Sequence, residues 1–163
     1  MSAIKYQVYL NLKEQERMNF ADYCATEEQR QKTNDEVSHY AVMLCDALYM
    51  DYKRFAMQSH NHAIAKGDSV EYHQSQVTKL YESGPDVEYY LETGRKYYKL
   101  IMQYKDSKSR SVHCFIDKKT GQIFKPASWK APAKGARYNL LDTNSREECY
   151  RRADWSGGYL YLK

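Results

Sequence analysis

The stretch that decides the fold is YKLIMQYKDSKSRSVHCFIDKKTGQIF, residues 98–124. Apolar and polar side chains alternate in three pieces of it, and a period of two is typical of β-strands with one buried face. The alternating apolar residues are Tyr98, Leu100, Met102 and Tyr104 in the first piece and Val112, Cys114 and Ile116 in the second, and residues 122–125 form the third. Residues 106–110 and DKKTG, residues 117–121, are polar connections, so the stretch predicts an antiparallel meander.

Upstream of the strands the apolar side chains recur every three or four residues, which is the helical period. The stripe of the first helix consists of Val37, Tyr40, Ala41, Leu44, Ala47, Leu48, Tyr52 and Phe55. Thr33 and Glu36 have the spacing of a capping box at its start. The helix ends either near Ser59 or at Lys66, where Gly67 is a suitable C-terminal stop.

A second helix follows the first. Asp68 and Glu71 have capping spacing at its start, and it ends at Gly84-Pro85. The two helices should pack as an antiparallel hairpin. Near the start of the chain, residues 4–10 alternate between apolar and polar side chains and favour a short strand, with a helix through Phe20 as the alternative.

Two prolines interrupt the sheet after its third strand. Pro126 and Pro132 lack the N–H that regular pairing needs, so residues 126–139 should form an exposed irregular loop. Helices followed by a meander predict an α+β fold, in which a helical hairpin is packed on, or appended to, an antiparallel sheet with a short helix. Residues 1–85 are the mainly helical region and residues 86–163 the sheet region, with the alternative that both form one compact domain.

The last part of the chain predicts one more helix and one more strand. Asn144 and Glu147 suit the start of a short helix that ends near Arg152, and residues 157–162 are expected to form a closing strand. The cysteines are spread along the chain without a C-x-x-C pair, which favours reduced, mostly buried thiols over a zinc site. They are Cys24, Cys45, Cys114 and Cys149.

Positive charge is concentrated in one segment. The chain has a net charge of +4, whereas residues 105–138 hold nine basic and two acidic residues. Such an uneven distribution indicates a surface that meets an anionic partner, and solvated lysines in a loop are the alternative. No run of 18 apolar residues and no secretory leader is present, so we expect a cytoplasmic protein that does not insert into a membrane.

The basic segment contains the strongest candidate site, a loop over residues 125–138. Its cations can neutralise phosphates, its aromatic rings can stack on a base, and its small residues allow a nucleic-acid backbone to approach. The predicted ligand-binding residues are Lys125, Trp129, Lys130, Lys134, Arg137 and Tyr138. In the alternative, Trp129 closes the end of the sheet while the lysines extend around it towards solvent.

Other kinds of site have weaker support. His60, His62 and His73 suggest a metal site, yet they lack a fourth ligand at a recognisable spacing, so surface histidines are expected instead. On a strand, His113 and Cys114 point to opposite faces and form no local catalytic pair. We therefore predict no catalytic residue, no metal and no cofactor.

The segments SVHCF, DKKTG, FKPASWKAPAK, ARYN and GGYLY, which lie between residues 111 and 161, together resemble a group of small, mostly uncharacterised bacteriophage-encoded proteins. The resemblance covers roughly residues 95–161 and leaves the helical half outside. It implies action in the cytoplasm of an infected bacterium, and it supplies no reaction, ligand or catalytic residue.

Three functions follow as hypotheses. The first is a non-enzymatic phage accessory protein that binds nucleic acid or a phosphate-bearing ligand through the basic loop. The alternative is a phage inhibitor that docks on a host enzyme or antiviral defence complex with the same basic patch. The second alternative is a small hydrolase or nuclease. The 17 tyrosines also permit a homodimer, because tyrosine is enriched at interfaces.

Overall fold

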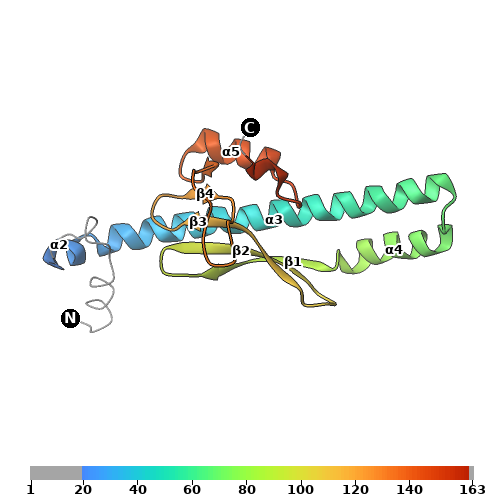
Figure 1. Cartoon of the computed structure of the whole chain (residues 1–163), viewed down its shortest axis with the longest axis horizontal. Coiled ribbons are helices and arrows are strands. Elements are labelled where there is room, and N and C mark those ends of the chain that lie inside the picture. The colour runs from blue at the N-terminus through green and yellow to red at the C-terminus, as the bar shows by residue number, and fades with distance from the viewer. Residues whose placement is uncertain (1–19, 162–163) are drawn as a thin grey trace.

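The computed structural model describes residues 20–161 and has the predicted α+β architecture (Figure 1). The expected strand at residues 4–10 lies outside the described residues. The elements in chain order are α2 (Phe20–Ala25), α3 (Glu27–Lys66), α4 (Val70–Ser83), β1 (Val87–Thr93), β2 (Tyr97–Tyr104), β3 (Arg110–Asp117), β4 (Gln122–Phe124), β5 (Tyr138–Asn139), α5 (Thr143–Arg152) and the 3-10 turn η2 (Gly158–Leu160).

Helix α3 is 40 residues long and runs along the long axis of the molecule (Figure 1). It begins before the expected capping box, because the Thr33 hydroxyl donates to the Gln29 carbonyl within the helix, at 3.0 Å, rather than capping its end. The longer of the two predicted ends is correct. Gly67 has a left-handed φ of 80°, and its N–H and that of Asp68 donate to the Ile64 and Ala63 carbonyls.

Helix α4 turns back along α3, so the predicted antiparallel hairpin is confirmed (Figure 1). Its N-cap is Ser69 rather than Asp68, and no side chain caps this end. Its C-terminal stop at Gly84 is as predicted. The φ of 75° at this residue favours glycine, and a Cβ there would also lie 2.3 Å from the Tyr49 hydroxyl oxygen, which would have to move. No helix within residues 20–161 is long and apolar enough to span a membrane.

The strands form one antiparallel sheet in the order β1-β2-β3-β4-β5, which confirms the meander and adds a strand at each end. The expectation of an unpaired loop up to residue 139 is wrong at two places. Tyr138 and Asn139 pair with β4, and Pro126 faces Pro132 in an isolated bridge. The prolines can face each other because neighbouring residues supply the donors: the Ala133 N–H donates to the Lys125 carbonyl at 2.7 Å.

The C-terminal segment differs most from its prediction. Helix α5 starts with Asp142 as its N-cap, whose carboxylate accepts the Ser145 N–H at 3.2 Å, rather than at Asn144. The expected closing strand is instead the 3-10 turn η2. The Asp154 carboxylate accepts the N–H groups of residues 156, 158 and 159, and this local set of hydrogen bonds curls the backbone away from any extended pairing.

One hydrophobic core joins the helices to the sheet. Side chains of α3 and α5 pack on the same sheet face, and the buried members are Val37, Ala41, Leu44, Cys45, Leu48, Tyr98, Leu100, Cys114, Ile116, Ile123, Tyr138, Leu140, Cys149, Ala153 and Leu160. All four cysteines are free thiols and three of them are buried here, as expected. Two distant tyrosines reinforce the contact: the Tyr150 hydroxyl donates to the Tyr40 carbonyl at 2.8 Å, and that of Tyr98 to the Asn34 carbonyl at 3.3 Å.

Candidate functional site

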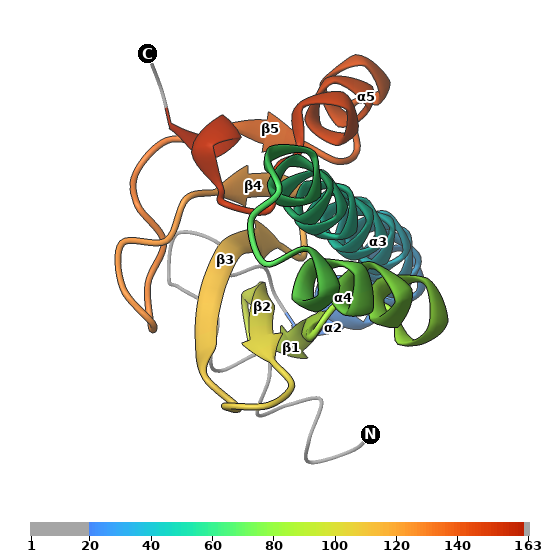
Figure 2. The same ribbon diagram turned by 90° about the vertical axis from the view of Figure 1, so that its right-hand side faces the viewer.

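The sheet face opposite α3, which we call the outer face, carries the candidate site. In Figure 2 the helices α3 and α4 lie on one side of the sheet, and the loop between β4 and β5 reaches to the other side. Residues Glu92, Lys99, Phe115 and Phe124 pair successively across β1 to β4, so they form one row on this face. The alternate residues Leu100 and Cys114 belong to the core on the helix side.

Trp129 lies against this outer face. Its ring centroid is 4.9 Å from the Lys99 Nζ and 4.8 Å from the Arg110 Cζ, so two cations from neighbouring strands contact the indole. Trp129 retains 38% of its surface exposed and does not belong to the core. The interpretation in which Trp129 closes the end of the sheet is therefore wrong. The indole is a partly exposed ring bordered by positive charge.

Lys130 and Lys134 extend from the same loop and are exposed. The Ser128 hydroxyl accepts the N–H groups of Lys130 and Ala131, at 3.3 and 3.2 Å, and so shapes the tip of the loop. Within residues 20–161, neither lysine amine has an ion pair or a ring contact. Both cations are thus exposed on the loop that carries Trp129.

Glu92 reduces the positive charge of the outer face. Glu92 accepts a 3.3 Å contact from the Arg110 guanidinium, which also donates to the Tyr90 hydroxyl at 3.0 Å. Both members of the ion pair are well exposed, and such pairs contribute little to stability. A phosphate that replaced Glu92 as the partner of Arg110 would therefore displace only a weak interaction.

Two of the predicted ligand-binding residues are occupied inside the protein. The Arg137 guanidinium donates to three backbone carbonyls, those of Leu160 at 2.8 Å, Lys134 at 2.6 Å and Gly135 at 2.5 Å. Tyr138 is buried in the core, and its hydroxyl donates to the Tyr159 carbonyl at 3.2 Å. The prediction that they bind a ligand is corrected here, because Arg137 ties the loop to the C-terminal turn and Tyr138 packs the sheet.

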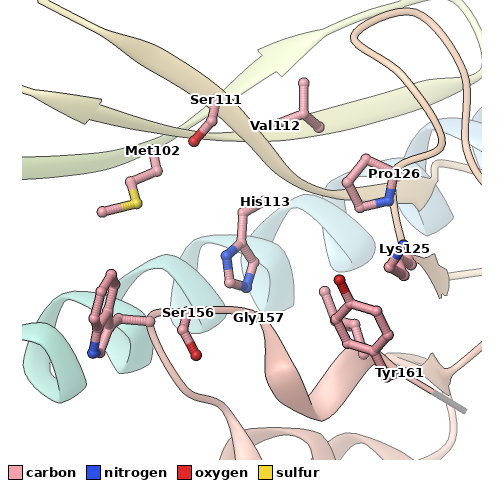
Figure 3. Close-up of a pocket in the computed structure, with 11 residues that line it drawn as sticks. Met102, Ser111, Val112, His113, Lys125, Pro126, Ser156, Gly157 and Tyr161 are labelled. Atoms are coloured by element: carbon pink, nitrogen blue, oxygen red, sulfur yellow. The ribbon is translucent and has the colours of Figure 1, made fainter.

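Lys125 is directed elsewhere, to a cavity of about 400 Å³ (Figure 3). Its Nζ lies 4.6 Å from the ring centroid of Tyr161. The cavity is lined by Met102, Ser111, Val112, His113, Lys125, Pro126, Trp155, Ser156, Gly157, Leu160 and Tyr161. Trp129, Lys130 and Lys134 do not line it, so the structure divides the predicted loop site between two places.

His113, at the wall of this cavity, is almost completely buried. Its Nε2 lies 2.8 Å from the Tyr159 hydroxyl oxygen. Burial lowers the pKa of His113 to about 4, against a smaller opposing effect of Asp154. The imidazole is therefore neutral at physiological pH and provides a hydrogen-bonding group rather than a charge.

The histidines of the helical hairpin are only partly brought together. His60 and His73 meet with their Nδ1 atoms 2.8 Å apart, while His62 is exposed. Burial, and secondarily His73, lower the pKa of His60. In the part of the chain that the structure describes, no three histidine, cysteine or acidic side chains are placed to hold a metal ion.

Sequence reasoning missed Lys99, Arg110 and Tyr161 as candidate site residues, and it considered His113 only as a catalytic partner of Cys114. Lys99 was recognisable in principle, because strand alternation places it opposite the apolar face, whereas Arg110 was predicted in the polar connection and begins β3 in the structure. The cavity was not recognisable, since it depends on a turn that the sequence predicts as a strand.

A protein family described as Family of unknown function (DUF7717) matches residues 20–162. The match includes the helical hairpin as well as the sheet. No curated protein and no solved structure matches the chain.

Proposed function

The chain belongs to DUF7717, a family of unknown function, and we propose that it is a non-enzymatic accessory protein that binds single-stranded nucleic acid on the outer face of its sheet. The resemblance of residues 95–161 to bacteriophage-encoded proteins supports a role in the cytoplasm of an infected bacterium. The proposal rests chiefly on Trp129, whose indole is 38% exposed and lies within 5 Å of two cationic groups.

The exposed Trp129 ring and its neighbouring cations suit single-stranded nucleic acid better than a duplex. A base can stack on an exposed aromatic ring only if it is not already stacked within a duplex, and each such contact contributes about 1–3 kcal/mol. The phosphates on either side of that base would meet Lys99 and Arg110 at the ring and Lys130 and Lys134 on the loop. None of these contacts reads a base edge, so the binding should tolerate many sequences.

The experiment measures the fluorescence anisotropy of labelled oligonucleotides, single-stranded and duplex, over a series of salt concentrations. Four neutralised phosphates should give a slope of log K against log salt of about −3 on single strands. Trp129→Ala should weaken binding by roughly 5- to 150-fold, which corresponds to about 1–3 kcal/mol. Glu92→Gln should strengthen binding, because it removes the acid beside Arg110.

A charge-matched control distinguishes binding at the outer face from non-specific electrostatic attraction between the protein and the oligonucleotide. Lys130→Glu with Lys134→Glu should nearly abolish binding, whereas Lys32→Glu with Lys66→Glu, two exposed lysines on α3, changes the net charge equally and should reduce affinity far less. Equal losses in the two double variants, or no binding at low salt, would refute the proposal. Shortening of the oligonucleotide during the titration would favour the nuclease alternative.

The inhibitor hypothesis has its own supporting observation. Within residues 20–161, six of the eight large apolar side chains that are exposed lie on the helical hairpin, among them Met50, Tyr72 and Tyr81. Exposed apolar and aromatic side chains are common in protein interfaces. A pull-down from infected cells with added nuclease tests this function, because a partner retained after nuclease treatment is held by protein contacts. Charge reversal of Lys130 and Lys134 should then slow association more than it speeds dissociation.

A further inference from the structure

We propose that the cavity beside His113 is a second binding site, separate from the outer face, for a nucleoside monophosphate or a ligand of the same chemistry, namely one anionic group joined to a flat ring with hydrogen-bonding atoms. Besides Met102 of β2, three chain segments form it. They are residues 111–113 of β3, residues 125–126 after β4, and residues 155–161 of the C-terminal turn (Figure 3).

A buried polar group faces this cavity. His113 is only 8% exposed, its Nε2 contacts the Tyr159 hydroxyl, and its Nδ1 has no hydrogen-bond partner within residues 20–161. A neutral imidazole has one donor and one acceptor nitrogen, and the Tyr159 hydroxyl can take either role towards Nε2. Nδ1 is not among the fully buried side-chain atoms that lack a partner, so it is open to the cavity and free to accept from or donate to a ligand.

The backbone keeps the approach to this nitrogen open. A Cβ at Gly157 would lie 3.7 Å from the His113 Cε1 and 4.0 Å from Nδ1, so any side chain there would occupy the space in front of the ring. Gly157 also has a φ of 83°, which other residues rarely adopt. The Asp154 carboxylate holds this turn through its hydrogen bonds to Gly158 and Tyr159.

The positive charge of the residues that line the cavity favours an anionic ligand. Among the described residues that line the cavity, Lys125 is the one cation and none is acidic. The Tyr161 ring beneath the Lys125 ammonium is 65% exposed and Lys125 is half-buried, so this pair lies at the rim of the cavity. A lysine ammonium attracts an anion as a point charge, and a phosphate monoester carries a charge of about −1.5 to −2 at pH 7, against −1 for a carboxylate. A phosphate is thus the better partner for Lys125.

The remaining residues that line the cavity favour a ligand with a flat, largely apolar ring. Met102, Val112, Pro126 and Leu160 surround the cavity, and the lining also contains the side chains of Ser111 and Ser156. A volume of about 400 Å³ is at the lower end of the range for small-molecule sites, roughly 300–1,000 Å³. It suits one nucleotide rather than a strand, with the base between the apolar side chains and the phosphate at Lys125.

The test is an NMR titration of the full chain with adenosine and cytidine monophosphates. We expect saturable shifts of the His113 ring and of the Met102 methyl group, with contacts between that methyl and the base protons. Inorganic phosphate, adenosine and benzoate should each bind at least about tenfold more weakly than the better nucleotide. Benzoate binding as tightly as the nucleotides would overturn the assignment to phosphate, and inorganic phosphate binding equally well would overturn the role of the ring.

Two variants examine the site without disturbing the core. Lys125→Met keeps the aliphatic stem and should weaken nucleotide binding at least about tenfold, the effect of losing one charge-assisted contact. Ser111→Leu fills the cavity from an exposed strand position and should abolish the shifts. Trp129→Ala should leave nucleotide binding unchanged, so this inference and the proposed function on the outer face can fail separately. No saturation at millimolar nucleotide, or full binding by Lys125→Met, would refute the site.

Discussion

The backbone N–H of Trp155 donates a 2.9 Å hydrogen bond to the carboxylate of Asp51, 104 residues earlier in the chain. The Trp155 ring then packs against the rings of Tyr52 and Phe55 on α3, with centroids 5.3 and 5.0 Å away. The long helix thereby holds the C-terminal turn, and with it one wall of the His113 cavity. The stability of that turn should depend on a residue that lies outside the sheet altogether.

We predict that Asp51→Ala lowers the free energy of unfolding by about 1–3 kcal/mol, because it leaves the Trp155 N–H without its acceptor. The Asp51 side chain is only 13% exposed. The matched control is Asp46→Ala, an exposed acid on the same helix, which should change stability by no more than about 0.5 kcal/mol. Urea unfolding measures both variants, and equal effects would contradict the role given to Asp51.

A second prediction concerns two tyrosine hydroxyls in different surroundings. The Tyr89 hydroxyl oxygen is buried and has no hydrogen-bond partner among the described residues, while the Tyr150 hydroxyl donates to the Tyr40 carbonyl. Tyr89→Phe should therefore be neutral or slightly stabilising, and Tyr150→Phe should cost about 1 kcal/mol. Chemical denaturation of the two variants in parallel tests this, and a larger loss for Tyr89→Phe would show that its hydroxyl has a partner.

Local patterns in the sequence predicted most of the framework. The change from helical to strand period correctly separated the hairpin from the meander, and Gly67 and Gly84 marked helix ends, because these features depend on neighbouring residues. Helix starts were less predictable. Thr33 and Asp68 had suitable capping chemistry but lie inside α3 or beside the actual N-cap of α4.

The candidate site was predicted only in part, since its composition depends on where side chains point. Trp129, Lys130 and Lys134 are accessible as expected, whereas Arg137 and Tyr138 are occupied by backbone and core contacts. An arginine that binds phosphate and one that binds carbonyl groups look the same in sequence. The closing strand failed for a related reason, because the side chain of Asp154 supplied hydrogen bonds that compete with strand pairing.

The buried His113 predicts a specific loss of stability in acid. Its pKa is near 4 in the folded protein and about 6.5 in the unfolded chain, so only the unfolded chain takes up this proton between those values. The free energy of unfolding should therefore be unaffected by this group above pH 6.5 and should fall as the pH drops from 6.5 to 4. The total loss from His113 is about 3 kcal/mol. Below pH 4 this group causes no further loss.

NMR titration of the histidine ring carbons measures this directly. The His113 signal should stay that of a neutral ring down to about pH 5. Unfolding at several pH values should also show that His62→Gln keeps the acid sensitivity of the natural protein. A His113 ring that becomes charged near pH 6.5 in the folded state would contradict its burial.

The last prediction separates Arg137 from the lysines of its own loop. Because its guanidinium donates to three backbone carbonyls, Arg137→Met should destabilise the protein by about 1–3 kcal/mol. Arg137→Lys should restore little, since one ammonium cannot reach carbonyls on both the loop and the C-terminal turn. Lys134→Met should change the free energy of unfolding by no more than about 0.5 kcal/mol.

In the oligonucleotide titration Lys134 should matter more than Arg137. Lys134→Met should reduce the salt slope by about 0.7, while Arg137→Lys, under conditions where it is folded, should leave the slope unchanged. A smaller slope for Arg137→Lys would mean that this guanidinium leaves its carbonyl partners to bind phosphate.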